Sequence, residues 1–271
     1  MREREWRSKP RPQRRPGDHR HLRRDRRSGR SDESDAAVIL YGWHTVTVAL
    51  ANPARRIRRL LATENALRRL QEEGIAVPMA PEIVRPDAIA ARLTPDAVHQ
   101  GLLAETDPLA SPDIEDLATS GIVLVLDQIT DPHNVGAILR TAAAFAVAAI
   151  VTTARHSPEA TGVLAKSASG ALEVVPIVTV QNLARALAEL KEQSFLVVGL
   201  DSAGPDDLAA MQMQAPLALV LGAEGKGLRQ GTRAACDRLA RLDLPGAIKS
   251  LNVSNAAALA LYIASRAIAP A

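Results

Sequence analysis

The sequence predicts an α/β protein built around a parallel sheet, and three observations support this class. From residue 121 onward, apolar runs of five to seven residues alternate with segments of helical periodicity. Such runs are typical of strands buried on both faces, as in parallel sheets covered by helices. The 271 residues are 47% hydrophobic but include only two Trp, two Tyr and two Phe, so a sizeable core must consist of Ala, Val, Leu and Ile.

The positive charge of the chain is concentrated at its start. Residues 1–30 contain 13 Lys and Arg against 4 Asp and Glu, whereas the net charge of the whole chain is +3. Residues 1–35 have too little apolar surface to offset the entropy of ordering, so we expect a disordered basic tail. An Arg-rich arm suits contact with RNA phosphates, although a solvated extension without a partner explains the same composition.

The composition also excludes several classes of protein. No apolar run reaches the ~18–20 residues that a membrane span needs, and the Arg-rich start lacks the apolar region of a secretory signal. A single cysteine, Cys236, excludes an internal disulfide and a cysteine-based zinc site. No cluster of His, Cys or carboxylates suggests a metal. We therefore expect a cytoplasmic protein with neither a membrane nor a metal partner.

Residues 36–106 predict a small α/β unit that precedes the main sheet. An opening apolar run leads into a helix through Val46 and Leu50. A strand at 57–62 and a helix at 64–73 that ends at Gly74 follow. A further strand, a short helix and a last strand near 98–104 complete the unit. The stretch 107–120, with its prolines and acids, is typical of a linker.

Residues 121–271 form the second predicted domain. We expect its strands at 122–127, 148–153, 174–180, 195–201, 217–222 and 240–245, and its helices at 134–147, 159–170, 182–193, 227–239 and 251–268. In open α/β sheets, ligands bind at the carboxyl ends of strands. Three polar clusters at such ends are therefore candidate parts of a functional site.

The first cluster lies in LDQITDPHNVGAILR, where a strand ends and a helix begins. Asn134 can cap that helix, and Arg140 lies in an otherwise apolar helical segment. An amphipathic helix with a capping Asn and an Arg that extends to solvent is the alternative interpretation.

The second cluster is the glycine-rich segment LVLGAEGKGLR, residues 219–229. Three glycines follow a buried strand, with Glu224 and Lys226 between them, so the backbone must turn sharply or let a ligand approach closely. The spacing matches neither a Walker A motif nor a G-x-G-x-x-G motif, so it gives no support for ATP or NAD. A glycine-rich turn with solvent-facing charges is the alternative.

The third cluster surrounds the start of the last helix. Lys249, Ser250, Asn252, Ser254 and Asn255 precede or begin a segment rich in Ala and Leu. Helix N-termini gather hydrogen-bond donors and suit polar or anionic ligands. A single capping residue at Ser250 or Asn252 is the alternative, but one cap does not need five polar residues.

Together the three clusters resemble the three motifs of the SpoU (TrmH-like) family of RNA 2′-O-ribose methyltransferases, within the SPOUT class. The matching segments are DPHNVGA with Arg140, LGAEGKGLR and SLNVS. Residues 36–105, with YGWH at 41–44 and AVHQG at 97–101, resemble the family's RNA substrate-binding domain. Periodicity alone would suggest an unknotted sheet, whereas the resemblance implies a deep trefoil knot at the C-terminus.

The resemblance also implies an activity, a cofactor and the residues that carry them. S-adenosylmethionine is the expected cofactor, held in the knot, and a homodimer with a shared active site is the expected assembly. The presence of the N-terminal unit favours a guanosine of large-subunit (23S) ribosomal RNA as the target. A tRNA 2′-O-methyltransferase and a catalytically silent RNA-binding or ribosome-assembly factor are the alternatives. The expected catalytic residues are Asn134, Arg140, Glu224, Ser250 and Asn252, and the expected cofactor-binding residues are Gly222, Leu242 and Leu251.

Overall fold

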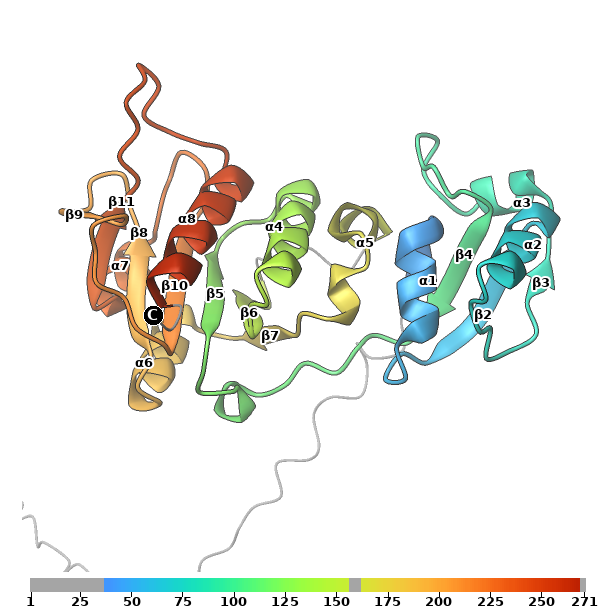
Figure 1. Ribbon diagram of the computed structural model, residues 1–271, viewed down its shortest axis with the longest axis horizontal. Helices are drawn as coiled ribbons and strands as arrows, with labels where there is room; N and C mark the ends of the chain where they lie inside the picture. The colour runs from blue at the N-terminus through green and yellow to red at the C-terminus, as the bar shows by residue number, and fades with distance from the viewer. Residues whose placement is uncertain (1–36, 156–161, 269–271) are drawn as a thin grey trace, which may run out of the picture. The chain divides into compact units, whose positions relative to one another are not determined.

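The computed structural model describes residues 37–155 and 162–268. The predicted basic tail lies outside the described residues, as does the start of the helix predicted at 159–170. The described chain contains one sheet of four strands and one of seven, both accompanied by helices (Figure 1). The predicted α/β class is confirmed.

The four-stranded sheet has the order β1-β4-β2-β3. Strand β4 is antiparallel to β1 and β2, and β3 runs parallel to β2. Thr63 caps α2 by accepting a hydrogen bond from Ala66 N. Gly74 follows the helix with a φ of 65°, as predicted for its C-terminal end. The elements are β1 (Val38–Tyr41), α1 (Trp43–Ala51), β2 (Ile57–Ala62), α2 (Glu64–Glu72), β3 (Glu82–Ile83), α3 (Pro86–Ala90) and β4 (Leu102–Thr106).

The last strand of this sheet begins later than predicted. The sequence suggests a strand near 98–104, but β4 starts at Leu102. Gln100 and Gly101 have φ angles of 51° and 81°, which extended strands do not tolerate. The chain therefore turns before it enters the sheet.

The seven-stranded sheet has the order β7-β6-β5-β10-β8-β11-β9, and all its paired strands are parallel. Its strands are β5 (Ile122–Asp127), β6 (Ala149–Thr153), β7 (Ile177–Val180), β8 (Leu196–Leu200), β9 (Asp206–Asp207), β10 (Leu217–Gly222) and β11 (Arg238–Arg241). The helices of this part are η1 (Ile114–Asp116), α4 (Pro132–Ala144), α5 (Gly162–Ala168), η2 (Ala171–Glu173), α6 (Leu183–Glu192), α7 (Gln230–Ala235) and α8 (Val253–Ile268).

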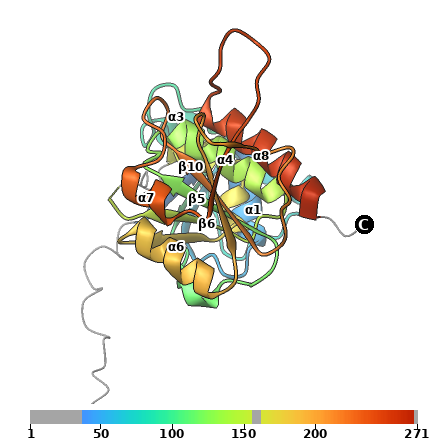
Figure 2. The same ribbon diagram turned by 90° about the vertical axis from the view of Figure 1, so that its left-hand side faces the viewer.

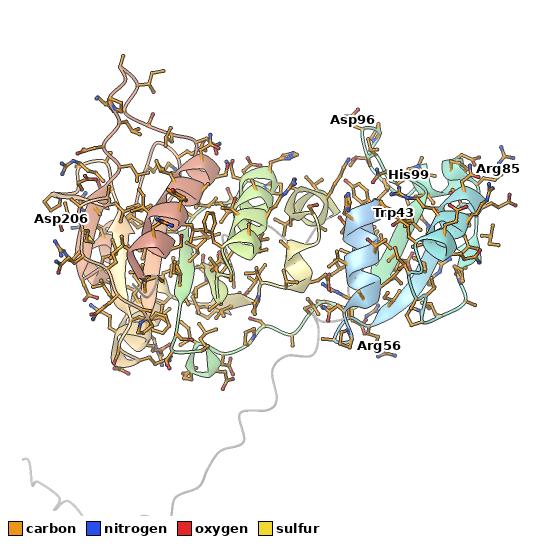
Figure 3. All side chains as sticks on the ribbon, in the orientation of Figure 1. Trp43, Arg56, Arg85, Asp96, His99 and Asp206 are labelled. Carbon is orange, nitrogen blue, oxygen red and sulfur yellow. The ribbon has the colours of Figure 1, made fainter. Side chains whose placement is uncertain are left out.

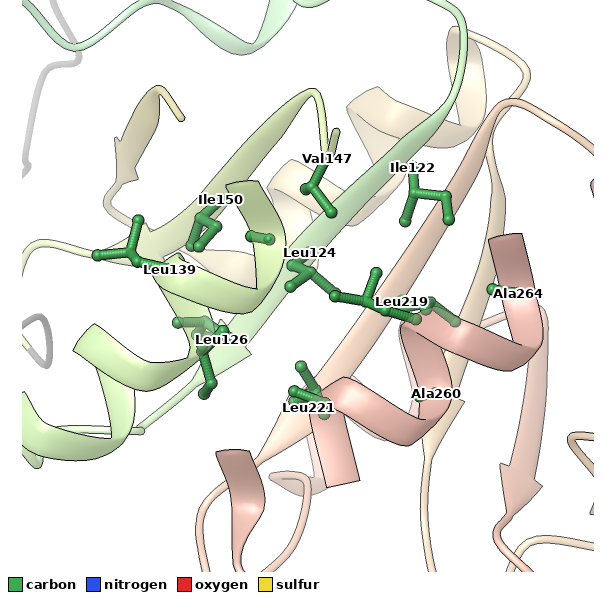
Figure 4. Packing of buried hydrophobic residues seen from close by; sticks show 14 of the residues in the cluster. Ile122, Leu124, Leu126, Leu139, Val147, Ile150, Leu219, Leu221, Ala260 and Ala264 are labelled. Atoms are coloured by element: carbon green, nitrogen blue, oxygen red, sulfur yellow. The ribbon is translucent and has the colours of Figure 1, made fainter. Parts of the chain in front are cut away.

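Alternate residues of the central strands supply two separate cores. On β5, Leu124 and Leu126 join the cluster that includes α4 and α8, whereas Val123 and Val125 join the cluster that includes α6. Figure 2 shows α4 and α8 on one side of the sheet and α6 on the other, and Figure 4 shows the first cluster around Leu124 and Leu219. This burial on both faces explains why the strands are uninterrupted apolar runs.

Two boundaries near the end of the sheet differ from the prediction. The helix expected at 227–239 is limited to α7, and the strand expected at 240–245 is β11, which begins earlier. Asp237 donates its backbone N–H to Val197 O, and its carboxylate accepts from Val197 N, both at 2.9 Å. These bonds tie the segment after α7 to β8, so it cannot continue as helix. The two-residue strand β9 was not predicted.

The chain between β11 and α8 projects from the body of the protein (Figure 1). Among the described residues, 242–251 make no backbone–backbone hydrogen bond. Helix α8 then returns across the sheet, where Ala257, Ala260 and Leu261 pack in the same cluster as Leu219 and Leu221 of β10 (Figure 4). The last helix is therefore held by the centre of the sheet.

A buried ion pair connects the segment after α1 with η2. Arg55 Nη2 lies 2.7 Å from Glu173 Oε1, and the two side chains are 4% and 2% exposed. Asn52 Nδ2 donates to the same carboxylate at 2.8 Å. Within 37–155 and 162–268, no helix has the length and apolar character needed to cross a membrane.

Candidate active site

The pairing of β5 with β10 brings the first two polar clusters together. The two strands are parallel and in register, with Leu126 beside Leu221 and Asp127 beside Gly222. Both strands therefore end at the same edge of the sheet. Strand β5 leads toward α4, and β10 leads into the glycine loop (residues 222–229). The start of α8 reaches the same place, because Val253 N donates to Glu224 Oε1 at 3.0 Å.

A hydrogen-bonded triad joins one residue from each cluster. Asn134 Nδ2 donates to Glu224 Oε1 at 3.3 Å, and Asn252 Nδ2 donates to Asn134 Oδ1 at 2.9 Å. These contacts fix the orientation of the Asn134 amide and leave the second oxygen of Glu224 without a donor among the described residues. The triad is a preformed polar surface with an acceptor available to a ligand.

Asn134 does not cap its helix, contrary to one interpretation of the sequence. Helix α4 begins at Pro132, and Asp131 is its cap, accepting from His133 N at 3.1 Å. Proline is well suited to the first helical turn because its missing N–H would be unpaired there anyway. Asn134 therefore lies within the first turn, where its side chain is available to Glu224 and Asn252.

Asn252 both caps α8 and belongs to the triad. Its Oδ1 accepts from the backbone N–H of Ser254 at 2.8 Å and from Ser254 Oγ at 2.6 Å. Its amide nitrogen is the group that reaches Asn134. The capping interpretation of this residue is therefore correct, and the same side chain also contacts the first polar cluster.

The glycine loop needs Gly222 for a close approach of its own backbone. A Cβ at this position would lie 2.2 Å from the carbonyl carbon of Gly227 and 2.5 Å from Leu228 N. Gly225 and Gly227 have φ angles of 74° and 65°, a conformation that favours glycine. The loop thus folds back over the end of β10 and presents Glu224 at the edge of the sheet.

A second ion pair holds the other end of this loop, and the sequence did not single it out. Asp127, which is fully buried, accepts from Arg229 N at 2.9 Å and from Arg229 Nε at 2.6 Å. The two residues are 102 positions apart. No spacing rule connects them, although an acid at the end of a buried strand could have signalled the need for a cationic partner.

Two of the predicted catalytic residues lie apart from the triad's hydrogen bonds. Arg140 and Ser250 are exposed, and the described residues make no hydrogen bond or ion pair with either side chain. Lys249 donates to Leu244 O at 2.5 Å, which closes the projecting loop on itself. The structure therefore brings Asn134, Glu224 and Asn252 together but leaves Arg140 free of their network.

The residues expected to hold a cofactor combine apolar surface with available backbone groups. Leu242 is half-buried, and Leu251 is 39% exposed. The backbone of 242–251 is not engaged in backbone pairing among the described residues. This combination fits a ligand such as S-adenosylmethionine, which carries both an aromatic ring and hydrogen-bonding groups. Within the described ranges, no group of three or more His, Cys, Asp or Glu is arranged to hold a metal ion.

Two family models match the chain and together span most of it. The model described as the SpoU rRNA Methylase family matches residues 121–262. The model described as RNA 2′-O ribose methyltransferase substrate binding matches residues 39–112.

Curated relatives match over nearly their whole length. A 23S rRNA (guanosine-2′-O-)-methyltransferase RlmB from Pseudomonas putida is 37% identical over 238 residues, covering 84% of this chain and 95% of the relative. The protein of the same name from Ralstonia nicotianae is 38% identical over 249 residues, covering 86% and 98%.

Solved structures share the fold. The SpoU methyltransferase AviRb from Streptomyces viridochromogenes, in complex with AdoMet, has a TM-score of 0.73 at 22% identity over 85% of this chain and 90% of that one. A putative RNA methyltransferase of the TrmH family from Porphyromonas gingivalis has a TM-score of 0.70 at 27% identity over 85% and 90%. From its motifs, its sheet and these matches, the chain belongs to the SpoU rRNA methylase family.

Proposed function

We propose that this protein methylates the ribose 2′-hydroxyl of a guanosine in 23S ribosomal RNA, with S-adenosylmethionine as the methyl donor. The observation that carries the proposal is the triad of Asn134, Glu224 and Asn252, which joins all three family motifs at one edge of the sheet. The relatives named above, which match over nearly all of their length, support the choice of RNA.

Asn134 and Glu224 position the ribose in this proposal. One oxygen of Glu224 already accepts two N–H groups, from Asn134 and Val253. Its other oxygen can accept a hydrogen bond from a ribose hydroxyl, which sets the direction in which the 2′-oxygen faces. Asn252 keeps the Asn134 amide in the orientation that this arrangement needs. Ser250, exposed in the neighbouring loop, is available to hydrogen-bond the RNA.

Arg140 stabilises the negative charge that develops on the 2′-oxygen. A guanidinium holds its proton too tightly to act as a base, but it is an effective electrostatic partner for an alkoxide. Its lack of any bond to the triad is consistent with an active site that is completed by a second copy of the chain. The bound S-adenosylmethionine supplies a methyl group that is already activated on a sulfonium.

The proposed cofactor site is formed by Gly222, Leu242 and Leu251, within a C-terminal trefoil knot. The path of the chain supports a knot, because β11 lies beyond β8 in the sheet whereas α8 returns to pack against β10. Val253 N also bonds to Glu224 in the glycine loop. We propose that the knot is formed by the segments 222–227, 242–247 and 248–254, and the bond from Lys249 to Leu244 O links the last two of them.

The proposed assembly is a homodimer in which α8 contributes to the interface. Leu259 and Tyr262 on this helix are 37% and 57% exposed, and Ile248 in the preceding loop is 78% exposed. Leu259 and Tyr262 are three residues apart and therefore neighbours on the surface of α8, and exposed apolar patches mark interaction surfaces. A monomer in light scattering, unaltered by Tyr262→Glu, would contradict this assembly.

The remaining parts of the chain receive the roles that the resemblance implies. Residues 36–106 are proposed as the RNA substrate-binding domain, 107–120 as a linker and 121–271 as the methyltransferase domain, acting on ribosomal RNA in the cytoplasm. The basic segment 1–35 is proposed to add nonspecific contacts with RNA phosphates.

The test is methyl transfer from labelled S-adenosylmethionine to undermethylated 23S rRNA, followed by mapping of the 2′-O-methyl group. We expect label in a guanosine, and a loss of at least ~100-fold in rate for Arg140→Ala. Arg185→Ala, on the opposite face of the sheet, is the matched control. No transfer by the wild type, or equal rates for the Arg140 and Arg185 variants, would overturn the proposal.

A further inference from the structure

The four-stranded sheet carries a surface cavity that the methyl-transfer site does not use. The cavity has a volume of about 380 Å³ and lies between the starts of α1 and α2 and the turn before β4. Its lining includes Trp43, Thr63, Asn65, Arg69, His99 and Gln100. Figure 3 shows Trp43 and His99 beside each other in this part of the chain. The volume falls in the range of ~300–1,000 Å³ that is typical of ligand pockets.

A flat cationic platform forms one wall of this cavity. The guanidinium carbon of Arg69 lies 3.8 Å from the centroid of the Trp43 ring, and Trp43 is only 4% exposed. Arg69 Nε also donates to Glu73 Oε1 at 2.7 Å, so the guanidinium is held at two points. The Arg69 side chain is 51% exposed, which leaves part of its surface open to the cavity. Guanidinium planes and aromatic rings are surfaces on which unpaired bases stack.

The polar groups around the platform each accept one hydrogen bond from the protein itself. His99 Nδ1 accepts from Gly101 N, and Gln100 Oε1 accepts from Trp43 N. Asn65 Oδ1 accepts from Arg68, and Thr63 Oγ1 accepts from Ala66 N. The groups that make no hydrogen bond within the described residues include four donors: the ring Nε2–H of His99, the two amide NH₂ groups and the hydroxyl hydrogen of Thr63.

The cavity depends on a glycine at its base. Gly101 has a φ of 81°, and a Cβ there would lie 2.4 Å from Thr63 Oγ1. Any larger residue would displace Thr63 and alter the bonds that orient the donors. The cavity is thus defined by the backbone as well as by its side chains.

We propose that this cavity binds one unpaired guanine base of the RNA, stacked on the Arg69–Trp43 platform. A lining rich in free donors matches the N7 and O6 acceptors on one edge of guanine, whereas adenine and cytosine present an amino donor there. The inference rests on the proposed function, and it assigns the RNA a second anchoring point on a different sheet from the methylated ribose.

The first experiment measures binding directly, without catalysis. In the full-length Trp6→Phe protein, Trp43 is the remaining tryptophan and reports on the cavity through its fluorescence. Single-stranded hexaribonucleotides UUGUUU and UUAUUU are titrated in turn. We expect the guanine oligonucleotide to quench Trp43 and to bind at least ~5-fold more tightly. Equal affinities and equal quenching would overturn the inference.

Matched variants distinguish the cavity from general electrostatics. Arg69→Gln and Arg56→Gln each remove one positive charge from the same part of the chain, but Arg56 does not line the cavity and is 83% exposed. We expect Arg69→Gln to weaken guanine binding ~10-fold and to raise the KM for 23S rRNA at unchanged kcat. Arg56→Gln should change both values less than ~2-fold.

A second variant tests the donor argument. Asn65→Asp replaces a free donor by an acceptor and keeps the group that pairs with Arg68, so the preference for guanine over adenine should fall to ~1. Circular dichroism checks that all three variants are folded. If wild-type protein transfers no methyl group, the proposed function is wrong. The fluorescence titration still decides whether the cavity binds guanine. If methyl transfer succeeds and Arg69→Gln equals Arg56→Gln, the cavity inference alone is wrong.

Discussion

The Asp127–Arg229 pair should be a main source of stability for the glycine loop. Substitution of Arg229 by Gln removes the guanidinium but leaves Asp127, which is fully buried, with only its bond from the backbone N–H of residue 229. Removing one partner of a buried pair costs ~3–5 kcal/mol. Because the Arg229 side chain is 40% exposed, water can partly replace it, so we expect a loss of ~2–3 kcal/mol.

This loss is large enough to measure by urea denaturation. It corresponds to roughly a 30- to 150-fold change in the folding equilibrium, and to a fall in Tm of about 4–12 °C for a chain of this size. Arg185→Gln, which breaks an exposed pair with Glu189, is the control and should cost at most ~0.5 kcal/mol. The double variant Asp127→Asn with Arg229→Gln should regain at least half of the loss, because no buried charge then lacks a partner.

Two results would refute this reasoning. Arg229→Gln could remain within ~0.5 kcal/mol of the wild type, which would mean that water fully solvates Asp127. Alternatively, the double variant could be no more stable than Arg229→Gln alone, in which case the uncompensated charge is not the cause of the loss.

Three further predictions concern other parts of the fold. Gly222→Ala would place a Cβ 2.2 Å from the carbonyl carbon of Gly227, so the loop must move by more than ~1 Å. Calorimetry should then show at least ~10-fold weaker binding of S-adenosylmethionine. An unchanged Kd would contradict this prediction. Burial raises the pKa of Cys236 from 9.0 to about 11, so at pH 8 its thiolate is ~100-fold scarcer than in the unfolded chain. Alkylation of the native protein should be correspondingly slow and should accelerate up to a pH of about 11; a native rate that levels off near pH 9 would disprove the shift. Arg55→Ala should lower the free energy of unfolding by ~3–5 kcal/mol because it leaves Glu173 buried without its cation. The double variant Arg55→Met with Glu173→Leu should recover most of this loss in urea denaturation. A double variant as unstable as the single one would show that the unpaired buried charge is not the cause.

The sequence predicted the elements whose own residues determine them. The strands at 122–127 and 217–222 agree with the structure because each is an uninterrupted apolar segment with clear ends. The strand at 57–62 also agrees, although only its second half is buried. The helix expected at 227–239 failed because contacts distant in sequence decide its end, through the bonds between Asp237 and Val197. Local periodicity carries no information about such contacts.

The candidate site shows the same division. Asn134, Glu224 and Asn252 were predicted from motifs at strand ends, and the structure brings them into one hydrogen-bonded group. The role of Asp127 was missed because its partner lies 102 residues away in a loop whose path only the sheet defines. Asp131 rather than Asn134 caps α4, since the proline that follows it fixes the helix start.

The bond between Asn134 and Asn252 spans 118 residues, and it has a consequence for the order of events during synthesis. The part of the site on β5 and α4 is made early, but the group that orients Asn134 is made almost last. Contacts so distant in sequence form late and slow the folding of the chain, and domains fold from the N-terminus during translation. The hydrogen-bonded group of Asn134, Glu224 and Asn252 is therefore complete only after α8 has docked, and a chain truncated before α8 would lack the amide that orients Asn134.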